Sequence, residues 1–174
     1  NTGSIQVSGT RTFSSGADYS YNGIAAQVTG TGLPASVRNL TISNTSGVSL
    51  TSSQSVEGTL SLASGTLNVG GNTLTLNGPA INTTSGNLAT TSGSSLVFGG
   101  SSSGVYIPSA VSDLLNLTVN NPGGVTLNSN ITLASGGTLT LASGILDAGS
   151  NVIAVTNTSS SAITSSETSF VNLA

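Results

Sequence analysis

The segment GTLSLASGTLNVGGNTLTL, residues 58–76, contains three short stretches in which apolar and polar residues alternate. The apolar pairs are Leu60/Leu62, Leu67/Val69 and Leu74/Leu76. Such alternation is typical of a strand with one buried face, because successive side chains point to opposite sides. Gly or Asn follows closely after each pair and signals a turn. The segment therefore predicts three short, evenly spaced strands that begin at positions 60, 67 and 74.

Three such strands make a unit of about 20 residues, the lower end of the range of periods in repeat folds. The unit recurs along the chain, because Leu40, Leu60 and Ile81 follow one another at nearly this interval. Coils of this kind stack and bury one continuous apolar column. We therefore expect an all-β fold: a parallel β-solenoid (β-helix) of about 20-residue coils with three short strands per coil. An antiparallel β-sandwich is the alternative, since frequent turn signals suit it too.

A longer repeat divides the chain into two copies. NLTISNTSGVSL (39–50) matches NLTVNNPGGVTL (116–127) at an offset of 116 − 39 = 77. GTLSLASG (58–65) matches GTLTLASG (137–144), and positions 65–76 match 144–155, both at an offset of 79. GSIQVSGT (3–10) resembles GSSLVFGG (93–100). We interpret residues 1–174 as a single repetitive β domain with internal copies at about 3–92 and 93–174.

The composition excludes several classes of partner. Charged residues make up 4% of the chain, against about 25% in ordinary domains, and the net charge is −3. With two arginines and no lysine, we expect no binding to nucleic acid. No apolar run approaches the length of a membrane-spanning helix, so we expect no membrane insertion. The absence of cysteine excludes disulfides and thiolate metal sites.

Residues 21–78, and again 115–155, resemble the tandem β-solenoid repeats of large secreted or surface proteins of Bacteroidota-type bacteria. The phrases LPASVRNLTISN (33–44) and GTLTLASGIL (137–146) carry the resemblance. Proteins of this kind are adhesin-like substrates of the type nine secretion route. The resemblance implies an extracellular or cell-surface location, an elongated β-rich stalk or fibre, and a role in adhesion or surface coating.

The chain has few groups for catalysis. There is no His or Lys to act as a base, and the acids are scattered at positions 18, 57, 113, 147 and 167. Asp113 and Asp147 could still meet across two coils, as a polysaccharide-cleaving solenoid would need. Asp147 also has Asn68 as its counterpart in the first copy, which suggests a turn-forming role. We expect no enzyme, no cofactor and no metal site.

Asparagines recur beside the predicted strands, and two explanations compete. One is a set of stacked Asn ladders at the coil corners, whose amides bond the coils above and below. The other is glycan attachment, because Asn39-Leu-Thr41 and Asn116-Leu-Thr118 have the acceptor sequence. The mixed Ser/Thr composition produces such triplets by chance, so we favour the ladders.

Aromatic residues gather in an inserted segment near the beginning of the chain. Phe13, Tyr19 and Tyr21 lie there, and the shorter counterpart of this segment in the second copy keeps only Tyr106. Two interpretations are open: a projecting loop that binds a ligand, or an aromatic cap over one end of the core.

Two classes of function follow from these observations. The first is a non-enzymatic structural module of an extracellular bacterial fibre or filament, which assembles end to end or forms a stalk. Self-association is then the expected partnership, either end to end or by strand addition, because open solenoid ends template pairing. The alternative is a cell-surface adhesin module that binds a glycan or a partner surface through inserted loops.

Overall fold

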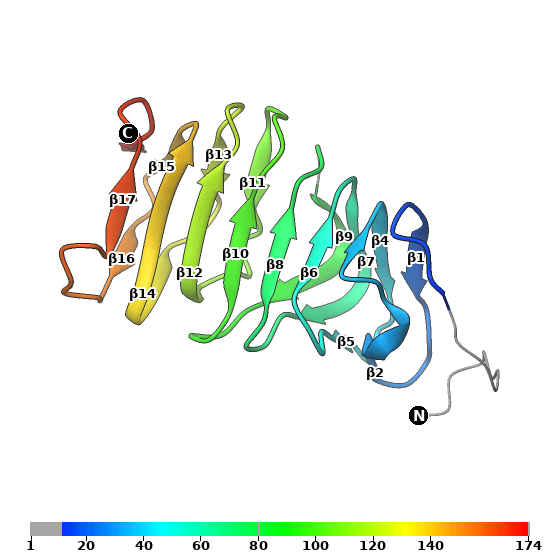
Figure 1. Ribbon diagram of the computed structural model, residues 1–174. Coiled ribbons are helices and arrows are strands. Elements are labelled where there is room, and N and C mark those ends of the chain that lie inside the picture. The colour runs from blue at the N-terminus through cyan, green and yellow to red at the C-terminus, as the bar shows by residue number, and fades with distance from the viewer. Residues whose placement is uncertain (1–11, 80, 174) are drawn as a thin grey trace.

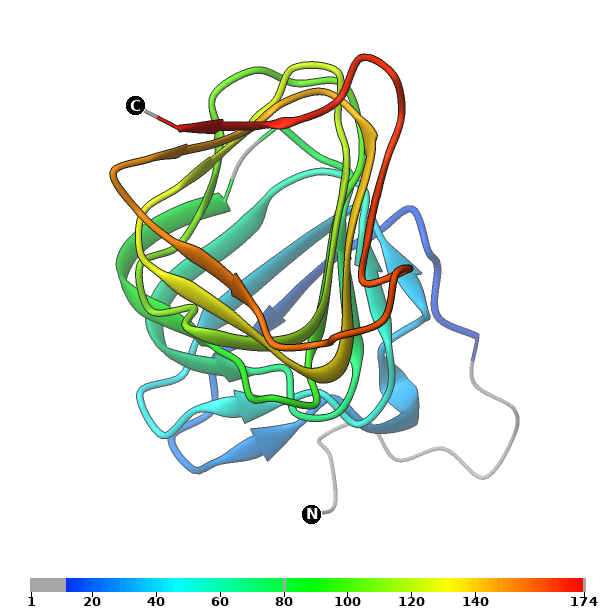
Figure 2. The same cartoon turned by 90° about the vertical axis from the view of Figure 1, so that its left-hand side faces the viewer.

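The chain folds as a parallel β-solenoid of about seven turns, which confirms the predicted architecture. The computed structural model describes residues 12–79 and 81–173. Every strand pair in this part of the chain is parallel, so the antiparallel sandwich is wrong. The predicted match of positions 3–10 lies outside the described residues. Figure 1 shows the strands side by side along one axis, and Figure 2 looks along the stacked coils.

Each coil has three faces, which we number in the order the chain visits them. Face 1 contains β1 (Asp18–Tyr21), β4 (Asn39–Ser43), the first parts of β7 (Leu60–Asn68) and β9 (Ile81–Ala89), β11 (Val105–Ile107), β13 (Val125–Leu127), β15 (Leu146–Gly149) and β18 (Val171–Leu173). The last four of these strands pair with one another in a separate four-stranded sheet. Between β9 and β11, the Tyr106 hydroxyl donates to the Ile81 carbonyl at 2.7 Å and joins the two parts.

Faces 2 and 3 complete the coil. Face 2 contains β2 (Gln27–Val28), β5 (Val48–Ser49), the second parts of β7 and β9, the first parts of β12 (Asp113–Asn120) and β14 (Ile131–Ser143), and β16 (Ile153–Val155). Face 3 contains β3 (Ser36–Val37), β6 (Gln54–Val56), β8 (Thr73–Leu76), β10 (Ser95–Phe98), the second parts of β12 and β14, and β17 (Ile163–Ser165). A short 3₁₀ turn, η1 (Gly30–Gly32), precedes β3.

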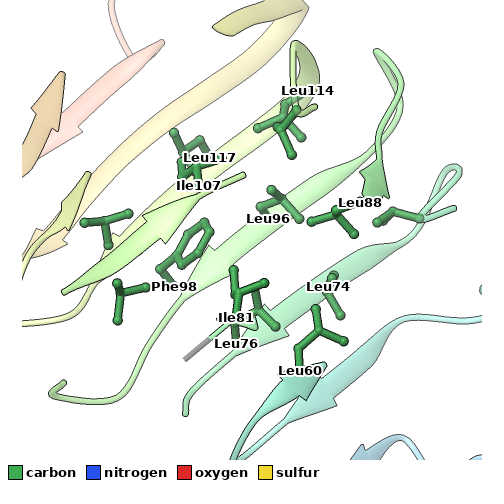
Figure 3. Close-up of a cluster of buried hydrophobic side chains, with 14 of the residues drawn as sticks. Leu60, Leu74, Leu76, Ile81, Leu88, Leu96, Phe98, Ile107, Leu114 and Leu117 are labelled. Carbon is green, nitrogen blue, oxygen red and sulfur yellow. The ribbon is translucent and has the colours of Figure 1, made fainter. Parts of the chain in front are cut away.

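The register confirms the predicted spacing of the apolar column. Leu40 pairs with Leu60, and Leu60 pairs with Ile81, as their even spacing in the sequence predicted. On face 3, Leu74 pairs with Leu96, which pairs with Leu117. These leucines are fully buried, and each contributes about 1.5–3 kcal/mol on burial. Figure 3 shows such side chains, from successive coils, gathered in the interior.

One short motif turns a corner inside β7, inside β14 and again between β14 and β15. The sequence Leu-Ala-Ser-Gly occurs at 62–65, 133–136 and 141–144. Its glycine has a left-handed φ each time: +73° at Gly65, +81° at Gly136 and +83° at Gly144. Because only glycine adopts this conformation readily, the motif bends the chain from one face to the next.

The two sequence copies are rotated relative to each other by one face. The strand containing NLTI (39–42) lies on face 1 in β4, whereas NLTV (116–119) lies on face 3 in β12. The interval along the chain from NLTI to NLTV is one strand segment less than four full coils. Equivalent residues of the two copies therefore face in different directions around the axis.

Candidate functional site

The two acids that the sequence suggested as a pair lie on different sheets. Asp113 is on β12 in the eight-stranded sheet and Asp147 is on β15 in the four-stranded sheet, so the suggested pair does not meet on one sheet. The Ser112 hydroxyl donates to the Asp113 carboxylate at 2.6 Å. Among residues 12–79 and 81–173, no three metal-binding side chains come together.

Two other carboxylates tie neighbouring coils together at one end of the solenoid. Arg38 donates to Asp18 at 2.7 Å in an exposed ion pair, and its guanidinium lowers the pKa of that carboxyl. Glu57 accepts from the hydroxyls of Ser55 at 2.6 Å and Ser36 at 2.8 Å, and from the Asn77 amide at 2.9 Å. Its three donors come from three successive coils.

Acid is expected to weaken the Glu57 connection. Hydrogen bonds from Ser55, Asn77 and Ser36 lower the pKa of Glu57 below its ordinary value of 4.5. A carboxyl with a lowered pKa stabilises the fold above its unfolded pKa, and this stability is lost as the pH falls through the folded pKa. We expect Glu57→Gln to be less stable than the parent at pH 7 and to lose less stability on acidification below pH 4.5. Urea unfolding midpoints at pH 7 and pH 3 measure this. Equal acid sensitivity of the two proteins would contradict it.

The predicted aromatic set is divided between two places. Tyr19 and Tyr21 are on β1, where they are in register with Leu40 and Ile42 and pack against the core. Burial raises the pKa of Tyr21. The Tyr19 hydroxyl donates to the Ser14 carbonyl at 2.8 Å, and the half-buried Phe13 ring lies near Gly32. These positions favour the cap over the projecting ligand loop for Phe13, Tyr19 and Tyr21.

Tyr106 lies apart from the other three residues of the predicted aromatic set, on β11 in the middle of the chain. It belongs to an outward row across four strands of face 1, in which Tyr106, Thr126, Asp147 and Asn172 are in register. Its hydroxyl also lies 3.3 Å from that of Thr83.

The asparagines bond between coils, as predicted, but they do not stack on one another. Asn72 donates to the Leu50 carbonyl at 3.1 Å, and its counterpart Asn151 donates to the Leu127 carbonyl at 3.0 Å. Both residues therefore bond the main chain of the preceding coil. The acceptor-sequence residues are also engaged: the Thr59 and Thr138 amides donate to Asn39 and Asn116.

The most deeply buried asparagines, Asn44 and Asn121, form equivalent corners of the two copies. Both side chains are 0% exposed. Asn44 donates to the Ala25 carbonyl at 2.8 Å, and Asn121 donates to the Ser102 carbonyl at 2.8 Å. In both corners the side-chain oxygen accepts from the amide two residues later. The repeat alone aligned these residues, but their burial depends on the neighbouring coil.

A groove of about 250 Å³ opens on face 1 of the second copy. It is lined by Gly104, Val105, Gly123, Gly124, Val125, Thr126, Ile145, Asp147 and Asn172, none of which is basic. Asn172 donates to the Asp147 carboxylate at 3.2 Å, and the Gly149 amide donates to the same oxygen at 3.2 Å. The sequence predicted no site here, although the double glycine at 123–124 and the Asp147/Asn68 difference were visible signals.

The C-terminal end of the solenoid exposes apolar side chains beside unpaired strand edges. Val152, Ile163, Phe170 and Leu173 are between 51% and 69% exposed. Ile153, Val155 and Val171 are partly buried against the core from the same end. Strands β16, β17 and β18 each pair on only one side among the described residues.

Comparisons with known proteins identify no relative. No family model matches the chain. Neither the curated proteins nor the solved structures contain a significant match. No helix in the described part is long and apolar enough to cross a membrane.

Proposed function

We propose that the chain is a non-enzymatic structural module of an extracellular bacterial fibre or filament, which extends by end-to-end stacking or forms part of a stalk. The observation that carries this proposal is the stacked parallel ladder, whose terminal strands have unpaired edges in the described residues. Unpaired edges template the addition of further strands unless charge, proline or a covering segment blocks them.

The two ends of the solenoid differ in chemistry. At the N-terminal side, Tyr19 and Tyr21 lie over the core, and Asp18 and Arg38 form an ion pair nearby. At the C-terminal side, β17 carries no charged residue and Ile163 is 54% exposed. The C-terminal edge is therefore the better surface for strand addition, because pairing there would also bury apolar area.

Electron microscopy of negatively stained protein at several concentrations tests the proposal. Long uniform filaments that grow with concentration are expected for a self-assembling subunit. Short separate rods at every concentration would contradict self-assembly and leave only the stalk.

Charged substitutions at the C-terminal edge are expected to block assembly. The double variant Ile163→Lys/Leu173→Lys places two lysines where a second chain would pair, and burying them unpaired is costly. We expect the concentration needed for filaments to rise more than about tenfold. Thr132→Lys is the matched control, because Thr132 is exposed in a strand on the side of the solenoid. Equal assembly of the double variant and the control would exclude this edge.

A further inference from the structure

The groove on face 1 differs from its counterpart in the first copy at positions that determine its chemistry. Gly123, Ile145 and Asp147 correspond to Ser46, Thr66 and Asn68 in the alignment of the two copies. In the first copy, the Ser46 hydroxyl donates to the Ile24 carbonyl of the preceding coil at 2.9 Å. Gly123 has no such hydroxyl, and the Ser102 main chain lies where its Cβ would stand.

The other two differences give the groove an apolar wall and an acceptor. Ile145 is 38% exposed at its edge, whereas the first copy has a threonine. Asn68 can donate, and its amide approaches the Val48 carbonyl at 3.4 Å. Asp147 is acceptor-only when ionised. The Gly149 amide and Asn172 both bond one of its oxygens, Oδ1.

We propose that this groove binds a neutral saccharide. Sugar rings combine hydroxyl donors, which suit the Asp147 carboxylate, with C–H faces, which suit Ile145. The volume of about 250 Å³ is just below the range of sites for drug-sized ligands, so it suits one ring. An anionic ligand is disfavoured, because the lining contains a carboxylate and no basic residue.

An outward row that contains three of the groove residues continues to Tyr106 on β11, and so extends the site for a longer saccharide. Tyr106, Thr126, Asp147 and Asn172 lie on four successive strands in register. Strands are about 4.8 Å apart, so the row spans about 14 Å. It presents an aromatic ring, a hydroxyl, a carboxylate and an amide in sequence, which are groups that contact polysaccharides. The proposal does not rest on end-to-end assembly, and the groove reaches the terminal strand β18 through Asn172.

Nuclear magnetic resonance with the whole chain tests the proposal. The probes are soluble neutral hexasaccharides of glucose, mannose, galactose and N-acetylglucosamine, titrated to millimolar concentration. The amide signals of Gly104, Gly123 and Gly124 report on the groove directly. We expect at least one sugar to shift them saturably and independently of salt. No shift with any of the four sugars, or shifts confined to the Tyr19 region, would overturn the proposal.

A variant that restores first-copy residues sharpens the test. Ile145→Thr/Asp147→Asn introduces the residues that the first copy already carries at these positions, so the fold is expected to persist. Sugar affinity should fall at least about tenfold, because a charge-assisted hydrogen bond and an apolar contact are both lost. Asp113→Asn, which removes a carboxylate from another sheet, should leave the affinity unchanged. Unchanged binding by the double variant would overturn the assignment. So would shifts of the same glycines by a lysine peptide alone, since the ligand would then be an amine.

Discussion

Replacing Gly65 with alanine is expected to lower the free energy of unfolding by about 3–5 kcal/mol. Two effects add in this loss: alanine in a left-handed backbone conformation is strained, and its Cβ clashes severely with the neighbouring coil. The φ of Gly65 is +73°, which alanine adopts at a cost. A Cβ at this position would also run into the main-chain carbonyl of Asn44 in the preceding coil. The main chain at Asn44 cannot move away easily, because the Asn44 side chain is buried and the Asn44 main-chain carbonyl accepts a hydrogen bond from the Gly47 amide. Urea unfolding followed by circular dichroism measures the loss.

Gly136→Ala separates the two causes of this effect. Gly136 ends the same Leu-Ala-Ser-Gly motif with a φ of +81°, but a Cβ there would meet nothing within 4 Å. We expect this control to lose only about 1–2 kcal/mol, the cost of the left-handed backbone. Gly144→Ala should resemble Gly65→Ala, because its Cβ would meet the Asn121 carbonyl. Equal losses at Gly65 and Gly136 would show that the close approach of the coils is not decisive.

Phe98→Ala is expected to lower the free energy of unfolding by about 3–5 kcal/mol, because it opens a cavity in the core. Phe98 is 0% exposed and is in register with Leu76 on one side and Val119 on the other. Its ring, labelled in Figure 3, is the largest fully buried side chain in the described residues. Neither aliphatic neighbour can fill the space that the ring leaves, because both are fixed in the ladder.

The position of Phe98 also predicts which strands lose stability in the Phe98→Ala variant. In a solenoid each coil contacts only its neighbours, so a weak coil can uncouple the segments on either side. Hydrogen exchange should therefore accelerate most around β8, β10 and β12. Phe170→Ala is the control, because Phe170 is 51% exposed and its removal should cost less than about 1 kcal/mol. Uniform acceleration along the whole chain would contradict this local effect.

The sequence periodicity predicted the coil, but it did not predict which outward side chains lie next to one another on the surface. The spacing of Leu40, Leu60 and Ile81 indicated both the coil length and the parallel register, because a stacked column requires like residues at one coil interval. Alternation distinguishes inward from outward side chains. It does not report which outward side chains become neighbours, since that depends on the lengths of the turns between strands.

The groove illustrates the part that the sequence could not supply. Asp147 and Asn172 are 25 residues apart, which is a longer interval than the usual coil, so the coil spacing alone did not pair them. Likewise, Asp113 and Asp147 looked close in coil number but lie on different sheets. The aromatic residues show the same limit, since Tyr106 was grouped with the first aromatic segment but joins a different part of the surface.

The rotation between the two copies determines which sides of the solenoid present a repeated surface feature to a partner. A unit that ends one strand segment short of a whole number of three-sided coils turns its equivalent features by one side each time. In a longer chain that continued this pattern, a feature carried by every unit would point in three directions in turn and then return to the first. Whichever side of such a rod lies against a surface, one unit in three presents the same feature to it. Several weak contacts to that surface can then add in avidity.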